Sequence, residues 1–185
     1  MRSAAAVMWS REIRSGTFPR YAGLADQGWE WWGGTVLRAS RAGLLSTRYE
    51  ITRDGIPICT WKPSAFIGGG TFELEGHRYD VARGGWTGRR YRLRDEDGRL
   101  VALADGVGRL TWTLEVFGES GSTSHTFERP SPFRRDQVLV VDGEQAGTVH
   151  RTSAWWGEAE AELPGLPLPV QVFVLVSLLG VWDED

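Results

Sequence analysis

The 185-residue chain has one cysteine, Cys59, and one lysine, Lys62, so its 21 basic residues are nearly all arginine. A lone thiol excludes an intrachain disulfide framework and favours a reducing, cytoplasmic compartment. The net charge of -3 and the pI near 5.7 argue against bulk nucleic-acid binding, which normally needs a basic chain. The first residues contain no sustained apolar stretch, and we expect no secretory signal there.

The sequence also lacks the short motifs of common catalytic and metal sites. Its three histidines, His77, His125 and His150, form no closely spaced pair, so a structural zinc site is not expected. There is no Gly-x-Ser-x-Gly elbow, and the triple glycine at 68–70 lacks the Lys and Ser/Thr of a phosphate-binding loop. We interpret it as a hairpin turn and Cys59 as a buried, inert thiol. We predict no catalytic residue, no metal and no cofactor.

Tryptophan (10) and glycine (24) are abundant, which suits an all-β protein with tight turns and bulky side chains on a curved sheet. Three Asp-Gly pairs each separate two strand-like segments, a strong hairpin signal. The predicted hairpins join 49–53 to 56–61, 91–94 to 100–103, and 138–141 to 146–149.

Other segments complete the expected order of strands. Further strands are predicted at 35–38, 44–49, 71–74, 78–82, 111–116 and 154–163. In the segment 154–163, glutamates at alternate positions suit an exposed strand face. A divalent-cation site is the alternative interpretation. The polar, Gly- and Pro-containing stretch 117–133 is interpreted as the longest flexible connection.

The longest apolar stretch runs from Val170 to Trp182, with Gln171 and Ser177 as its only polar residues. A helix that is apolar on every side is enclosed by protein or lies in lipid. A transmembrane span needs roughly 20 residues, and this stretch is shorter and preceded by prolines. We expect a buried core helix and no transmembrane span; a membrane tail anchor is the alternative.

Together these patterns resemble the tubby C-terminal domain superfamily in its short bacterial LURP-one-related form, a group that includes the phospholipid scramblases. The resemblance rests on the strand meanders with Asp-Gly hairpins, the triple glycine followed by Thr71–Leu74, and the terminal apolar helix. Its matching parts are 49–116, 137–163 and 170–182, and we expect a barrel domain at 29–185 that follows an N-terminal arm, 1–28. The lysines that mark the eukaryotic phosphoinositide-binding members are absent.

The resemblance implies a mainly β fold: a closed antiparallel β-barrel of about twelve strands wrapped around the buried C-terminal helix, 170–182. Physical reasoning agrees, because closure removes strand edges and a barrel of this size has a lumen too wide for strand side chains alone to fill. The resemblance also implies a non-enzymatic binding module for anionic lipid headgroups or a membrane-associated partner, in the cytoplasm or at the membrane periphery.

The strongest charge pattern is a row of arginines, Arg90, Arg92 and Arg94, which follows Trp86. On a strand, alternate side chains project to one face, and guanidinium groups match phosphate oxygens. We predict a headgroup-binding patch, with Trp86 suited to a membrane interface. The alternative is a solvated strand face whose charge is balanced by the acids at 95–97.

Two tryptophan clusters are candidate partner-binding sites: Trp29, Trp31 and Trp32, and Trp155 and Trp156. Adjacent side chains on a strand point to opposite faces, so one of each neighbouring pair should lie at the surface and anchor a partner. Cover by the N-terminal arm is the alternative. A protein-interaction subunit is therefore the second functional hypothesis. A small-ligand carrier is the third and weakest, because the helix should occupy the lumen.

Overall fold

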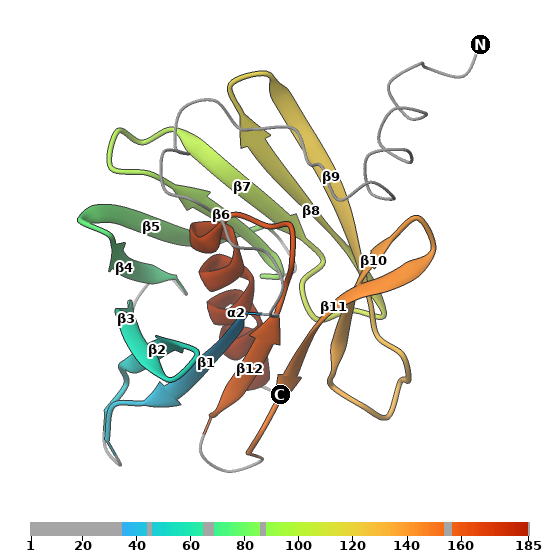
Figure 1. The fold of residues 1–185 in the computed structure, drawn as a ribbon, viewed down its shortest axis with the longest axis horizontal. Coiled ribbons are helices and arrows are strands. Elements are labelled where there is room, and N and C mark those ends of the chain that lie inside the picture. The colour runs from blue at the N-terminus through green and yellow to red at the C-terminus, as the bar shows by residue number, and fades with distance from the viewer. Residues whose placement is uncertain (1–34, 44–45, 65–68, 86–87, 154–156, 185) are drawn as a thin grey trace. The chain divides into compact units, whose positions relative to one another are not determined.

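The computed structural model describes residues 35–43, 46–64, 69–85, 88–153 and 157–184. Within them twelve antiparallel strands form a closed barrel, in which each strand pairs with its neighbours along the chain and β1 pairs with β12 (Figure 1). The predicted fold class is confirmed. The predicted N-terminal arm, 1–28, lies outside the described residues.

The strands are short and follow one another closely. They are β1 (Val36–Arg41), β2 (Tyr49–Arg53), β3 (Ile56–Pro63), β4 (Gly70–Leu74), β5 (His77–Gly84), β6 (Arg90–Arg94), β7 (Leu100–Asp105), β8 (Thr111–Gly118), β9 (Gly121–Glu128), β10 (Gln137–Val141), β11 (Glu144–Arg151) and β12 (Ala159–Glu162). The helix α2 (Leu168–Trp182) follows the last strand.

The three predicted Asp-Gly hairpins are confirmed, and the dihedral angles explain them. Asp54 and Gly55 have φ of 50° and 82°, and Asp142 and Gly143 have φ of 54° and 83°. Two-residue hairpins of this type need positive φ at both central positions, which Asp-Gly supplies. In the hairpin at Asp97-Gly98, which joins β6 to β7, only Gly98 has a positive φ, of 77°, and the loop is longer.

Three expectations about local structure were wrong in whole or in part. The segment 117–133 contains strand β9, which pairs with β8 along its whole length and with β10 on its other side. Its serines and glycines suggested a loop, but hydrogen bonds from two neighbouring strands outweigh that weak propensity. The predicted strand 44–49 is not found in its described part before Tyr49, because residues 46–48 form no strand and β2 begins only at Tyr49. The triple glycine is not simply a turn either, since Gly70 is the first residue of β4.

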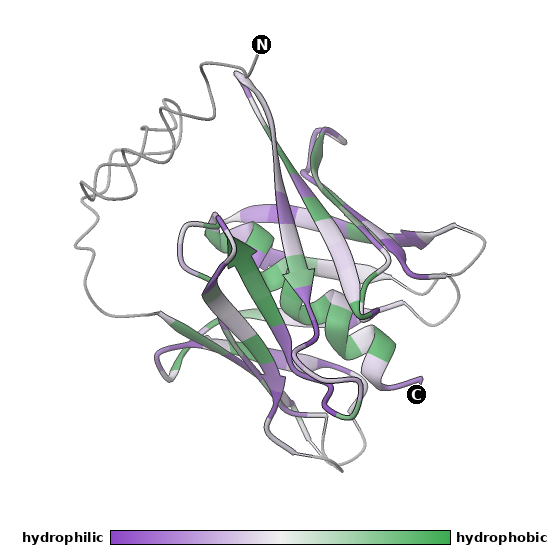
Figure 2. Cartoon of the chain, turned by 90° about the vertical axis from the view of Figure 1, so that its right-hand side faces the viewer, coloured by the Kyte–Doolittle hydropathy of each residue, from purple (hydrophilic) through white to green (hydrophobic). Residues whose placement is uncertain are grey.

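Helix α2 lies inside the barrel, which confirms the prediction of a buried helix (Figure 1). It contacts β1 and β12 on one side and β6 and β7 on the other. Figure 2 shows it as an apolar element surrounded by strands. Its buried residues are Val170, Val172, Phe173, Val174, Leu175, Val176, Ser177, Leu178, Leu179, Val181 and Trp182. In the described part of the chain, no helix combines the length and apolarity needed to cross a membrane.

Two arginine–tyrosine pairs lie at the barrel end that receives the C-terminus of α2. Arg41 is paired in register with Tyr49, and Arg83 with Tyr91. In each pair the guanidinium carbon lies over the tyrosine ring, 5.7 Å and 5.8 Å from its centroid, a cation–π geometry. The same arrangement is therefore built in two different hairpins.

Each pair holds one acidic residue that follows the helix. The Tyr49 hydroxyl donates a hydrogen bond to Oδ2 of Asp183 over 2.6 Å. Arg83 donates through both terminal nitrogens to the carboxylate of Glu184, with an Nη2–Oε2 distance of 2.7 Å. These contacts fix the end of α2 to the barrel rim. The arginines also complement the helix dipole, because they are cations near a helix C-terminus.

Candidate functional site

The predicted arginine row lies on the outer face of β6. Arg90, Arg92 and Arg94 are exposed, whereas Tyr91 and Leu93 point into the core. The strand therefore alternates as predicted. The three arginines line an open groove of about 400 Å³, called here the arginine groove, together with Gly84, Gly85, Leu100 and Leu103.

Small residues on β5 create this groove. Arg90 is paired in register with Gly84, and Arg92 with Ala82. A Cβ atom on Gly84 would lie 3.5 Å from Nη2 of Arg92, so the guanidinium group passes close to the bare glycine. Because Gly84 and Ala82 carry little or no side chain, the guanidinium groups of Arg90 and Arg92 remain accessible from the β5 side, whereas Asp80 lies beside Arg94.

Arg90 is the arginine of the row that is held in an ion pair. Its Nη2 atom lies 2.6 Å from Oδ2 of Asp105, its register partner on β7. This hydrogen bond lowers the pKa of Asp105 and raises that of Arg90. The pair thus neutralises one end of the row.

The other two arginines are less constrained by acids. Nη1 of Arg94 donates to the carbonyl oxygen of Gly98 over 2.6 Å, and Asp80 lies opposite Arg94 in the β5–β6 register. Arg92 forms no ion pair or hydrogen bond through its side chain with any residue that the structure describes. It is therefore the guanidinium group of the row most available to a ligand.

In the alternative interpretation the acids at 95–97 balance the row, but in the structure they contact other residues. Glu96 lies 3.0 Å from Nδ1 of His77, Asp97 lies 3.8 Å from Arg99, and Asp95 accepts a hydrogen bond from the Arg99 backbone. The balancing acid is Asp105, which sequence reasoning missed. The signal was available: a hairpin centred on 95–98 places Asp105 opposite the start of β6.

A second groove of about 550 Å³ was not anticipated. It is lined by Arg48, Thr60, Lys62, Thr71, Phe72, Glu73 and Arg78. Register pairing adds Glu50 beside Thr60 and Asp80 beside Thr71. Three cations and three carboxylates thus share this face, and its charge is balanced. Counted in the same way, the arginine groove has Asp80, Asp105 and Glu115 as register neighbours of its lining residues, so what distinguishes it is the unpaired side chain of Arg92 and not a larger net charge.

Comparison with known proteins adds nothing to this picture. No protein-family model, curated protein or solved structure matches the chain.

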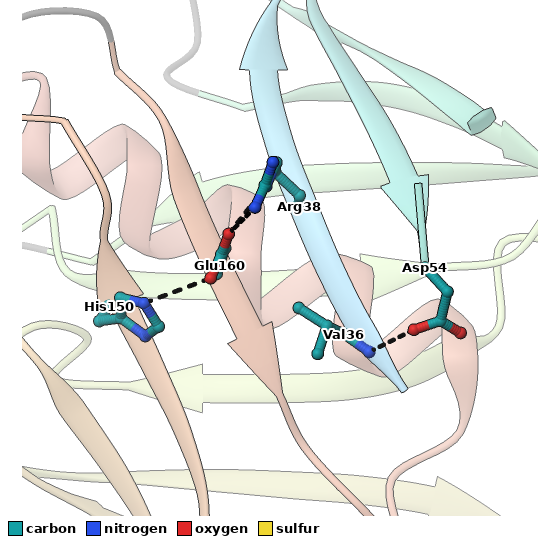
Figure 3. A network of polar contacts seen from close by, with 5 residues as sticks. All are labelled: Val36, Arg38, Asp54, His150 and Glu160. Carbon is teal, nitrogen blue, oxygen red and sulfur yellow. Dashed lines mark hydrogen bonds and ion pairs between the residues drawn. The ribbon is translucent and has the colours of Figure 1, made fainter. Parts of the chain in front are cut away.

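The glutamates of β12 and the single cysteine show no sign of metal or nucleophile chemistry. Glu160 accepts a hydrogen bond from Arg38 and lies 3.4 Å from Nε2 of His150, so it bridges β1 and β11 (Figure 3). Within the described ranges, no group of three potential ligands is arranged to hold a metal ion. Burial raises the pKa of the Cys59 thiol to about 12, as expected for an inert cysteine.

The remaining predicted site residues lie outside the described residues: Trp86 of the headgroup patch, and Trp29, Trp31, Trp32, Trp155 and Trp156 of the partner-binding clusters. The arginine groove is therefore the part of the predicted site whose geometry the structure describes.

Proposed function

We propose that this barrel is a non-enzymatic, tubby-like binding module that recognises the headgroup of an anionic lipid in the arginine groove. The observation that carries the proposal is the unpaired guanidinium group of Arg92, flanked by Arg90 and Arg94 along an open groove. An arginine fork donates two parallel hydrogen bonds to phosphate oxygens, which suits a phosphodiester headgroup.

The core of the barrel supports a surface site rather than an internal one. Phe173, Leu175 and Leu178 of α2 are completely buried, so the helix fills the volume where a carrier would hold its ligand. This favours lipid recognition over the small-ligand hypothesis. The protein-interaction hypothesis depends on tryptophans outside the described residues and gains no support from the geometry.

Vesicle flotation tests the proposal. The protein is mixed with vesicles of phosphatidylcholine alone, or with added phosphatidylglycerol, and the fraction that floats is measured. We expect recovery only with the anionic vesicles. Because one basic residue near such a surface contributes about 1 kcal/mol, Arg92→Gln should weaken binding about fivefold.

Arg99→Gln is the matched control, since it removes the same charge from an exposed side chain outside the arginine groove. It should leave flotation close to that of the wild type. Equal recovery with both vesicles, recovery with neither, or equal losses in the two variants would contradict the proposal.

A further inference from the structure

Two neighbouring loops expose large apolar side chains. They are the β7–β8 loop, residues 106–110, and the β9–β10 loop, residues 129–136. Phe133 is 96% exposed and Leu110 is 57% exposed. The backbone N–H of Arg129 donates to the carbonyl oxygen of Leu110 over 2.7 Å, which ties the loops together. The two exposed apolar side chains therefore belong to a pair of loops that a backbone hydrogen bond joins.

These loops rest on the end of the buried helix. A Cβ atom on Gly108 would lie 2.9 Å from Cγ1 of Val181, so the first loop packs directly on α2. In the second loop, Nη1 of Arg135 donates to the carbonyl oxygen of Trp182 over 3.4 Å. The loops that carry the exposed apolar side chains are therefore held in place by contacts with α2.

The same loops are strongly basic. They contain Arg109, Arg129, Arg134 and Arg135, with Asp136 as their only acid. Arg109 and Arg134 are exposed, and neither lies within 4 Å of a carboxylate among the residues that the structure describes. This surface, called here the loop tip, combines protruding apolar groups with cations although the chain as a whole is acidic.

We propose that the loop tip docks on an anionic bilayer. Phe133 and Leu110 enter the interface, and Arg109 and Arg134 bind lipid phosphates around them. Interfacial binding combines burial of apolar side chains with attraction of basic residues to anionic lipids, and the loop tip offers both. A Phe side chain that protrudes almost fully would need a matching pocket on a protein partner, whereas a bilayer accepts it without one.

The loop tip lies beside one end of the arginine groove, the end at Arg90. The backbone N–H groups of Gly106 and Val107 both donate to the carbonyl oxygen of Arg89, over 3.0 Å. The β7–β8 loop is thus fixed beside Arg90, at the end of the groove. This inference rests on the proposed function and extends it, because docking at the loop tip would bring the groove to the headgroup layer.

The test compares the double variant Leu110→Ser/Phe133→Ser with Ile56→Ser. Ile56 is 68% exposed and follows the β2–β3 hairpin at the opposite end of the barrel, so it is a matched control. Flotation uses phosphatidylglycerol/phosphatidylcholine vesicles, and insertion pressure is measured on monolayers of the same composition. We expect the double variant to bind at least tenfold more weakly and to insert at lower pressure. Ile56→Ser should match the wild type in both assays.

The outcomes separate the two proposals. If Arg92→Gln weakens flotation and the double variant does not, the proposal that the loop tip docks on the bilayer is overturned, and the proposal of a headgroup site in the arginine groove is supported. If only the double variant weakens flotation and insertion, the loop tip stands without the groove. A double variant that changes only the oligomeric state, measured by light scattering, would assign the surface to a second copy and overturn the proposal. A wild type that binds no anionic vesicle overturns both.

Discussion

Gly70 is a residue where two adjacent strands leave no room for a side chain. A Cβ atom there would lie 2.7 Å from Cη2 of Trp61 and would overlap the carbonyl oxygen of Lys62. Since neither a backbone carbonyl nor a buried indole can move freely, Gly70→Ala should lower the free energy of unfolding by roughly 1–3 kcal/mol. Urea unfolding followed by tryptophan fluorescence measures this difference.

Gly84→Ala is the matched comparison. Gly84 also lies on a strand, but its Cβ would meet only Nη2 of Arg92, at 3.5 Å, an ordinary contact. The free energy of unfolding of the Gly84→Ala variant should stay close to that of the wild type. Equal destabilisation by the two substitutions would show that general strand effects, and not the contacts of Gly70, determine the loss.

Two histidines should titrate on opposite sides of the usual value. The hydrogen bond with Glu96 raises the pKa of His77, whereas burial lowers the pKa of His125. With an unfolded pKa near 6.5, His77 contributes stability below that pH, which is lost as pH rises through its folded pKa. The contribution of His125 to stability depends on pH in the opposite direction. It is lost once the pH drops below about 6.5, because the unfolded chain then takes up the proton and the folded chain does not.

An NMR titration of the histidine ring protons, assigned with His77→Gln and His125→Gln, checks this order. The midpoint of His125 should lie below that of His77. The reverse order would mean that the ring of His125 is solvated or that the contact between His77 and Glu96 is absent in solution.

At the scale of elements, the end of α2 depends on carboxylates bound to the barrel rim. Asp183→Asn/Glu184→Gln should lower stability by about 1 kcal/mol, because these side chains are partly exposed and screened by solvent. The loss should shrink at high salt. Arg83 lowers the pKa of Glu184, so its contribution is present above the unfolded pKa and lost as pH falls through the folded value.

Denaturant unfolding at low and high NaCl measures this effect, with Asp97→Asn as the control. Asp97 lies 3.8 Å from Arg99 in a pair that is highly exposed on both sides, so its loss should be close to zero. Similar losses of stability in both variants would show that the contacts at the helix end contribute no more than an exposed surface ion pair.

The strand elements also show which sequence signals are reliable. Asp54-Gly55 and Asp142-Gly143 predicted their hairpins because a two-residue turn is a local problem of dihedral angles. Strand β9 was missed because its glycine and serines suggested a loop, although its threonines and Phe127 favour a strand. It becomes a strand through pairing with β8 and β10, which lie on either side of it in the closed barrel.

At the scale of the whole molecule, α2 is the core of the barrel. Its buried residues are all apolar except Ser177. At about 1.5–3 kcal/mol for each of these large side chains, their burial contributes roughly 15–30 kcal/mol before the entropy cost of ordering them. That exceeds the net stability of about 5–15 kcal/mol of an ordinary domain. A chain that ends at Pro167 should therefore lose cooperative unfolding and the dispersion of its NMR spectrum.

A chain that ends at Trp182 is the control. It loses the acidic residues but keeps the helix, and it should fold with only a small loss of stability. A compact, cooperatively melting protein without residues 168–185 would show that the strands form a core of their own and that the central helix is dispensable.

The sequence by itself determined the β class, the Asp-Gly hairpins, the buried helix and the alternation that exposes Arg90, Arg92 and Arg94. These follow from short-range rules: a period of two in strands, the dihedral angles of tight turns, and the insolubility of a helix that is apolar on every side. Only the tertiary structure decided that Asp105 neutralises Arg90, and that Leu110 and Phe133 protrude from adjoining loops. Such contacts join residues on different strands or loops, so they exist only once the barrel has closed and set its register.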